Sequence, residues 1–203
     1  MSITRSRSLA AAIALSLSAG FAVPAAAQTM ADSKPATLLI SGGLAVPVGG
    51  MADVATTGFI GLAGVTYRRL GLPIAARGEV LYHHLGANDD AAYPGRAGFV
   101  VTDRIATLGL ALSGVLTLSD TDQGQFYAIG GLGVYRQNIK GVSLPGGPGG
   151  SAEDNTTRGG YNIGAGFERP LGGANWFVEA RLHQMFSGDP RGTILPLTIG
   201  LRF

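Results

Sequence analysis

Apolar and polar residues alternate with a period of two along most of the chain after residue 37. The pattern is clearest at the C-terminal end, where one face carries Leu and Ile and the other carries mostly small or polar residues. This period is typical of β-strands, because successive side chains of a strand point to opposite faces. The alternation, and the turn residues that interrupt it, predict eight strands: Thr37–Val48, Gly58–Arg69, Ile74–Leu85, Arg104–Leu118, Gln125–Gln137, Gly159–Arg169, Trp176–Phe186 and Thr193–Phe203.

The predicted connections alternate between long and short. The two longest, residues 86–103 and 138–158, follow the third and fifth strands, and the second contains the run Pro145–Gly150, whose composition argues against regular structure. The connections after the second, fourth and sixth strands are short turns. Long connections at one end and short turns at the other are typical of a transmembrane β-barrel, here an eight-stranded antiparallel up-and-down barrel.

The N-terminal segment has the features of a secretory signal peptide. Arg5 and Arg7 precede an apolar run, and alanines at positions 25–27 provide the small residues of a cleavage site. We therefore expect three parts: a cleaved signal peptide over residues 1–27, a short disordered lead over 28–36 and an outer-membrane barrel domain over 37–203. Export would place the mature protein outside the cytoplasm.

Composition narrows the possible classes of protein. The chain has no cysteine, which excludes disulfides and thiolate metal sites. Arg5 and Arg7 account for the net charge of +2, so the mature segment holds 13 basic and 13 acidic residues and gives no indication of nucleic-acid binding. No mature stretch has the roughly 18 consecutive apolar residues of a transmembrane helix. These properties leave a β-sandwich, a soluble barrel or a transmembrane barrel.

Charged residues gather on one parity of the predicted strands. An eight-stranded barrel is just wide enough to be filled by its own side chains. An Arg or Lys facing lipid at mid-membrane costs about 2–4 kcal/mol, whereas charges placed inside can pair with one another. We therefore predict an ionic network in the lumen, formed by Arg77, Glu79, Glu168, Glu179, Arg181 and Arg202. Aromatic residues near strand ends on the other parity are predicted to lie at the membrane interfaces: Tyr82, Tyr161, Trp176 and Phe186.

The segments Tyr127–Tyr135, Gly160–Glu168, Trp176–His183 and Leu195–Phe203 carry a family resemblance. They resemble the small outer-membrane β-barrel family, which includes the transmembrane domain of outer membrane protein A and the OmpX/Ail-type proteins. The resemblance implies a place in the outer membrane of a Gram-negative bacterium, among outer-membrane lipid and lipopolysaccharide. It also implies that Phe203, with Leu201 where the family often has an aromatic residue, forms the C-terminal signal read by the barrel-assembly machinery. Such motifs specify a fold and a location rather than an activity.

Two patterns that could indicate binding chemistry are weak. His83 and His84 are adjacent, but neighbours on a strand point to opposite faces and cannot bind one metal ion together. The glycine-rich stretches 130–133 and 146–150 lack the helix and lysine of a phosphate-binding loop. We therefore predict no metal and no cofactor.

A hydrolase active site is a further alternative to a protein without catalytic residues. Ser187 and His183, with Glu179 or Asp189, could form the nucleophile, base and orienting acid of a lipid-modifying barrel enzyme, but no motif fixes their geometry. An unchanged mass spectrum of lipid A after expression of the protein would exclude this activity.

The predicted function is non-enzymatic. We expect a membrane-embedded scaffold whose surface-exposed connections, residues 86–103 and 138–158, contact an extracellular partner in adhesion or support envelope integrity. The alternatives are a small porin-like channel, a lipid-modifying outer-membrane enzyme and a soluble lipocalin-like carrier. Bilayer conductance would identify a channel, and release into the periplasmic fraction without detergent would identify a soluble carrier.

Overall fold

The computed structural model describes residues 35–68, 73–88, 100–143, 152–186 and 192–203. These residues form eight strands and one short 3-10 helix, η3 (Gly49–Met51). The strands are β1 (Ala36–Pro47), β2 (Ala55–Arg68), β3 (Ile74–Ala87), β4 (Val100–Thr121), β5 (Gly124–Ser143), β6 (Ala152–Leu171), β7 (Ala174–Met185) and β8 (Thr193–Arg202). Among the described residues, no helix is long and apolar enough to cross a membrane.

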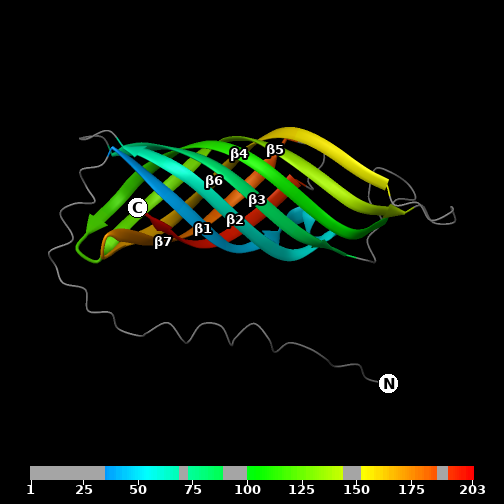
Figure 1. Ribbon diagram of the computed structural model, residues 1–203, viewed down its shortest axis with the longest axis horizontal. Helices are drawn as coiled ribbons and strands as arrows, with labels where there is room; N and C mark the ends of the chain where they lie inside the picture. The colour runs from blue at the N-terminus through cyan, green and yellow to red at the C-terminus, as the bar shows by residue number, and fades with distance from the viewer. Residues whose placement is uncertain (1–34, 69–72, 89–99, 144–151, 187–191) are drawn as a thin grey trace, which may run out of the picture.

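Every strand pairs antiparallel with its neighbours in the chain, and β8 pairs with β1 to close the barrel. At this closure Leu197 lies opposite Leu44, and Leu38 and Phe203 exchange two backbone hydrogen bonds of 2.8 and 3.1 Å. Figure 1 shows the strands wound obliquely around the long axis of the barrel. The predicted fold, an eight-stranded antiparallel up-and-down barrel, is confirmed.

The two ends of the barrel differ. The β4–β5 and β6–β7 connections are reduced to residues 122–123 and 172–173, and the C-terminus lies at this same end, which we call the short-turn end (Figure 1). The opposite end, which we call the long-connection end, carries the connections after β1, β3, β5 and β7. The predicted alternation of long and short connections is therefore confirmed.

The central strands extend further toward the long-connection end than the sequence predicts. The expectation of an irregular connection over 138–158 is wrong, since β5 continues to Ser143, β6 begins at Ala152, and Asn138 lies opposite Asn155. The backbone of every residue except proline can continue the ladder of cross-strand hydrogen bonds, so a polar composition alone does not end a strand. Residues 144–151 of this connection, and 89–99 of the other predicted contact loop, lie outside the described residues.

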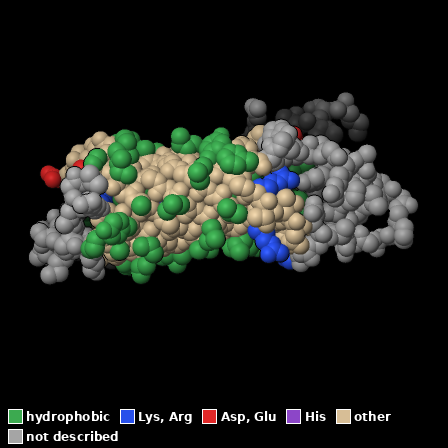
Figure 2. Space-filling view, turned by 90° about the horizontal axis from the view of Figure 1, so that it is seen from above, with side chains coloured by type: hydrophobic (Ala, Val, Ile, Leu, Met, Phe, Trp, Pro, Cys, Tyr) green, Lys and Arg blue, Asp and Glu red, His purple; other side chains and the backbone are tan. Residues whose placement is uncertain are grey.

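Around the middle of the barrel, apolar side chains face outward and charged side chains face inward. Leu112 and Leu132 on the outside are 68% and 66% exposed, whereas Arg77 on the inside is fully buried. The Leu and Ile row of β8 also lies outside, and Figure 2 shows hydrophobic side chains distributed along the visible face of the barrel. This distribution is the reverse of that in soluble proteins, where Arg is almost never fully buried unless it is paired.

Several glycines of the strands leave no room for a Cβ atom against the neighbouring strand, and Gly164 on β6 is one of them. A Cβ atom added there would overlap the backbone carbonyl oxygen of Ala180, which cannot move without displacing β7. We expect Gly164→Ala to lower the free energy of unfolding by about 1–3 kcal/mol, measured by urea titration of the folded barrel. The matched control is Gly78→Ala on the outer face, where an added Cβ meets nothing within 4 Å. Equal stability of the two variants would contradict this account of the wall.

Candidate functional site

Four charged side chains meet across the middle of the barrel interior. Arg77 and Glu79 come from β3, and Glu179 and Arg181 come from β7; residues two apart on a strand face the same side. Arg77 Nη1 donates to Glu179 Oε2 at 2.7 Å, and Arg181 donates to Glu79 at 2.5 and 3.0 Å and to Glu179. All four residues are buried, so each charge is balanced by direct contact with an opposite charge.

Aromatic side chains complete this charged layer. The Tyr127 hydroxyl donates to Glu179 Oε2 at 2.9 Å, and the Arg77 guanidinium lies over the rings of Tyr127 and Phe177, 5.5 and 6.0 Å from their centroids. Sequence reasoning did not place Tyr127 in the network. Its position on the inward parity of β5, which it shares with Tyr135, could have indicated this contact.

Glu168 and Arg202 form a separate pair nearer the short-turn end. Arg202 Nη1 lies 2.7 Å from Glu168 Oε2, and Asn175 Nδ2 donates to Glu168 Oε1 at 2.6 Å. The six residues predicted to share one network thus lie in two groups. Both groups are inside the barrel, and the difference arises because Glu168 and Arg202 lie close to the ends of β6 and β8.

A histidine layer follows the charged layer toward the long-connection end. The rings of His83 and His183 lie 5.5 Å apart, and the Tyr135 hydroxyl is 3.1 Å from His183 Nδ1. His84 points to the other side of β3 and stacks on Phe59 with ring centroids 5.0 Å apart. The two adjacent histidines therefore face opposite sides, as the strand geometry predicts. Among the described residues, no group of three or more His, Cys, Asp or Glu side chains is placed to hold a metal ion.

The residues of the hydrolase alternative are committed to other contacts or lie outside the described part of the chain. Glu179 accepts hydrogen bonds from Arg77, Arg181 and Tyr127, and His183 is buried beside Tyr135. The nucleophile Ser187 and the alternative acid Asp189 lie outside the described residues.

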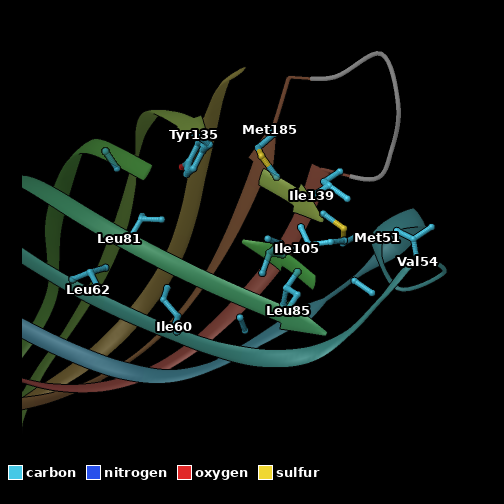
Figure 3. Packing of buried hydrophobic residues seen from close by; sticks show 14 of the residues in the cluster. Met51, Val54, Ile60, Leu62, Leu81, Leu85, Ile105, Tyr135, Ile139 and Met185 are labelled. Carbon is cyan, nitrogen blue, oxygen red and sulfur yellow. The ribbon is translucent and has the colours of Figure 1, made fainter. Parts of the chain in front are cut away.

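An apolar plug fills the long-connection end of the interior. Figure 3 shows inward side chains from the strands converging there with two residues carried by the β1–β2 connection. The plug consists of Met51, Val54, Leu85, Ile105, Ile139, Met185 and Ile194, each 6% exposed or less. Sequence reasoning did not identify it, because η3 brings Met51 back over the interior and no strand pattern predicts that return. The charged, histidine and apolar layers favour a filled barrel over a wide channel.

The predicted interface aromatics lie on the outside, toward the two ends. Tyr82, Tyr161 and Phe186 are 41%, 40% and 60% exposed, and the Tyr161 and Phe186 rings lie 6.1 Å apart. Trp176 is half-buried and lies opposite Leu201 near the short-turn end. The C-terminal residues Leu201 and Phe203 also face outward there, with exposures of 37% and 53%.

Two exposed arginines, Arg104 and Arg136, lie on the outside of the barrel between the apolar surface and the long-connection end, and we call them the basic rim. Arg136 on β5 lies opposite the outward-facing Leu108, and Arg104 lies further along β4; both arginines are exposed. Figure 2 shows Lys and Arg side chains at one border of the hydrophobic surface. The molecule thus has three zones that could carry function: the filled interior, the apolar outer wall and this rim.

Comparison with known proteins places the fold. No family model and no curated protein matches the sequence. The crystal structure of Neisserial surface protein A is similar, with a TM-score of 0.55 and 14% identity over 83% of this chain and 96% of that chain. A major outer membrane protein from Thermus thermophilus is similar with a TM-score of 0.58 and 15% identity, over 84% of this chain and 99% of that chain. The resemblance seen in the sequence is therefore confirmed for the fold: the chain has the eight-stranded barrel fold that these two outer-membrane proteins share.

Proposed function

We propose that this protein spans the outer membrane of a Gram-negative bacterium and acts there as a non-enzymatic scaffold with surface contacts. The observation that carries this proposal is the reversed distribution of side chains. Apolar residues such as Leu110, Leu112 and Ile199 are exposed around the wall, while Arg77 and Arg181 are buried. Soluble monomers rarely expose apolar patches of more than a few hundred Å², whereas a lipid-facing barrel wall requires a continuous one.

The positions of the aromatic residues and of the C-terminus support an orientation. Tyr82, Tyr161 and Phe186 toward one end and Trp176 toward the other suit the two interfaces of a bilayer. We place the short-turn end in the periplasm and the long-connection end outside the cell, in line with barrels of this type. In this orientation Phe203 is presented on the periplasmic side, where the assembly machinery would read it.

The surface contacts are assigned to a sheet formed by the ends of β4, β5 and β6. The pairing of β6 with β7 ends at Gly160 opposite Met185, while β6 continues back to Ala152 beside β5. This extension is polar in sequence, from Glu153 to Arg158, and it projects beyond the barrel at the long-connection end (Figure 1). A projecting polar sheet suits contact with an extracellular partner better than it suits packing against lipid.

Shortening this extension tests the proposed role. Replacing residues 137–156 by Asn-Gly would connect the opposed pair Arg136 and Thr157 by a two-residue turn. The variant loses most of the polar extension, together with Ile139 of the plug, and keeps the barrel up to Arg136. We expect binding of expressing cells to surfaces to fall by about tenfold or more, because a few contact residues carry most of an interface's energy. Binding would be compared at equal amounts of folded protein, measured by heat-modifiable gel migration.

The matched control replaces residues 144–151 by Gly and Ser at constant length. It separates the loss of the projecting strands from the loss of the connection between them. Unchanged binding and unchanged detergent sensitivity of cells carrying the shortened variant would contradict the proposed contact role. Absence of the protein from the outer-membrane fraction would contradict the proposed location.

A further inference from the structure

A shallow apolar groove crosses the outer face of β2 to β5. Its walls are formed by Val65, Val80, Leu112, Leu132 and Val134. Gly78 forms part of its floor, and a Cβ added at this glycine would meet nothing within 4 Å. In the pairing register, Val80, Leu110 and Val134 form one row across the strands, and Gly78, Leu112 and Leu132 form the next.

The basic rim lies directly beyond this groove. Arg136 is the next outward-facing residue after Val134 on β5, and it lies opposite Leu108, which in turn lies opposite Tyr82 on β3. Arg104 lies further along β4 on the same face, and both arginines are exposed. Within the described part of the chain, neither guanidinium has an ion-pair partner. The groove and the rim thus form one continuous surface with an apolar part and a cationic part.

The chemistry of this surface fits an acylated, phosphorylated lipid. A guanidinium can bind two phosphate oxygens at once through its fork of N–H groups, and this pairing is strong where apolar surroundings exclude water. An acyl chain beside Val134 would continue along the groove toward the middle of the wall, where apolar contact replaces contact with mobile lipid. Tyr82 lies in the same cross-strand row as Arg136. Tyrosine rings are enriched at this interface, where the lipid headgroup meets the acyl chains.

We propose that this surface binds lipopolysaccharide of the outer leaflet, with its lipid A phosphates at Arg136 and Arg104 and an acyl chain in the groove. Lipid A joins two phosphates and several acyl chains in one headgroup, which matches two separated cations above a groove that spans four strands. An ordinary phospholipid offers one phosphate and two chains. The assignment rests on the proposed orientation, because only the outer leaflet would bring this lipid to the long-connection end.

The test measures lipid A binding to the folded protein in non-ionic detergent by native mass spectrometry and by titration. We expect the double variant Arg104→Gln, Arg136→Gln to bind bisphosphorylated lipid A about tenfold more weakly than the parent protein. The control is Arg169→Gln, which removes an exposed arginine near the short-turn end and should leave the affinity unchanged. Parent-like affinity of the double variant would overturn the proposal.

A second variant tests the groove independently of the charges. Gly78→Leu would place a side chain in the open floor of the groove, and we expect weaker binding of acylated lipid A with no change for its deacylated sugar phosphate. Equal affinity of the parent protein for lipid A and phosphatidylglycerol would overturn the assignment to lipopolysaccharide. If the parent protein lies in the outer membrane but does not bind lipid A, this inference alone is refuted, whereas absence of the parent protein from that membrane refutes the proposed function.

Discussion

Replacing Arg181 by methionine is expected to lower the free energy of unfolding by about 3–5 kcal/mol, because it leaves buried carboxylates without their counter-charge. Arg181 donates to both Glu79 and Glu179, and all three side chains are buried. Arg77 reaches Glu179 at 2.7 Å but lies 3.7 Å from Glu79, so it cannot replace both contacts. The measurement is urea-induced unfolding of the refolded barrel, followed by heat-modifiable gel migration and tryptophan fluorescence.

Two controls separate the charge balance from general damage. Arg104→Met removes an exposed arginine outside the barrel and should change the free energy of unfolding by less than about 1 kcal/mol. Replacing Arg77, Glu79, Glu179 and Arg181 together by Met or Leu should cost much less than the sum of the single changes, because replacing a complete buried ionic group by apolar residues is often neutral. Equal losses for Arg181→Met and Arg104→Met would show that the buried network does not stabilise the barrel.

Replacing Leu112 by arginine is expected to cost about 2–4 kcal/mol when the barrel is folded in a lipid bilayer. Leu112 is 68% exposed near the middle of the outer wall, so the new guanidinium would face hydrocarbon. The measurement is the free energy of unfolding from vesicles in urea.

The matched control for this change is Leu118→Arg. Leu118 lies on the same strand and is 61% exposed, but it is close to the end of β4 at the short-turn end, where the expected cost is only about 0–1 kcal/mol. A dependence on depth is a property of a membrane-spanning wall. If Leu112→Arg were as stable as Leu118→Arg, the outer surface would face water and the proposed location would be wrong.

The sequence could predict which side chains point to the same side of each strand, because this depends only on whether residues are an even or odd number of positions apart. Arg77 and Glu79 share one side of β3 with His83 whatever their partners are, and Leu197 and Ile199 share the outer side of β8. The number of strands and the alternation of their connections also follow from local turn residues and the two-residue period. These features predicted the barrel, its apolar outside and its charged inside.

The extent of β5 and β6 could not be predicted in this way. Polar residues such as Asn138 and Asn155 remain in strands because their backbones pair with each other, and no property of either segment alone shows this pairing. The apolar plug has a similar origin. Met51 lies in a connection whose residues show no strand period, and only the fold of η3 brings it over the interior.

The sequence alone therefore determined which side chains face inward, and the tertiary structure decided which of them meet. Arg181 contacts Glu79 from the opposite side of the barrel, while Glu168 pairs with Arg202 at another level. The position of each inward side chain along the barrel axis depends on the tilt and stagger of all eight strands, and these are fixed only when the sheet closes. Strand β8 shows both contributions. The alternation of its residues predicted its apolar outer face, whereas its pairing with β1 set the position along the barrel axis at which Arg202 reaches Glu168.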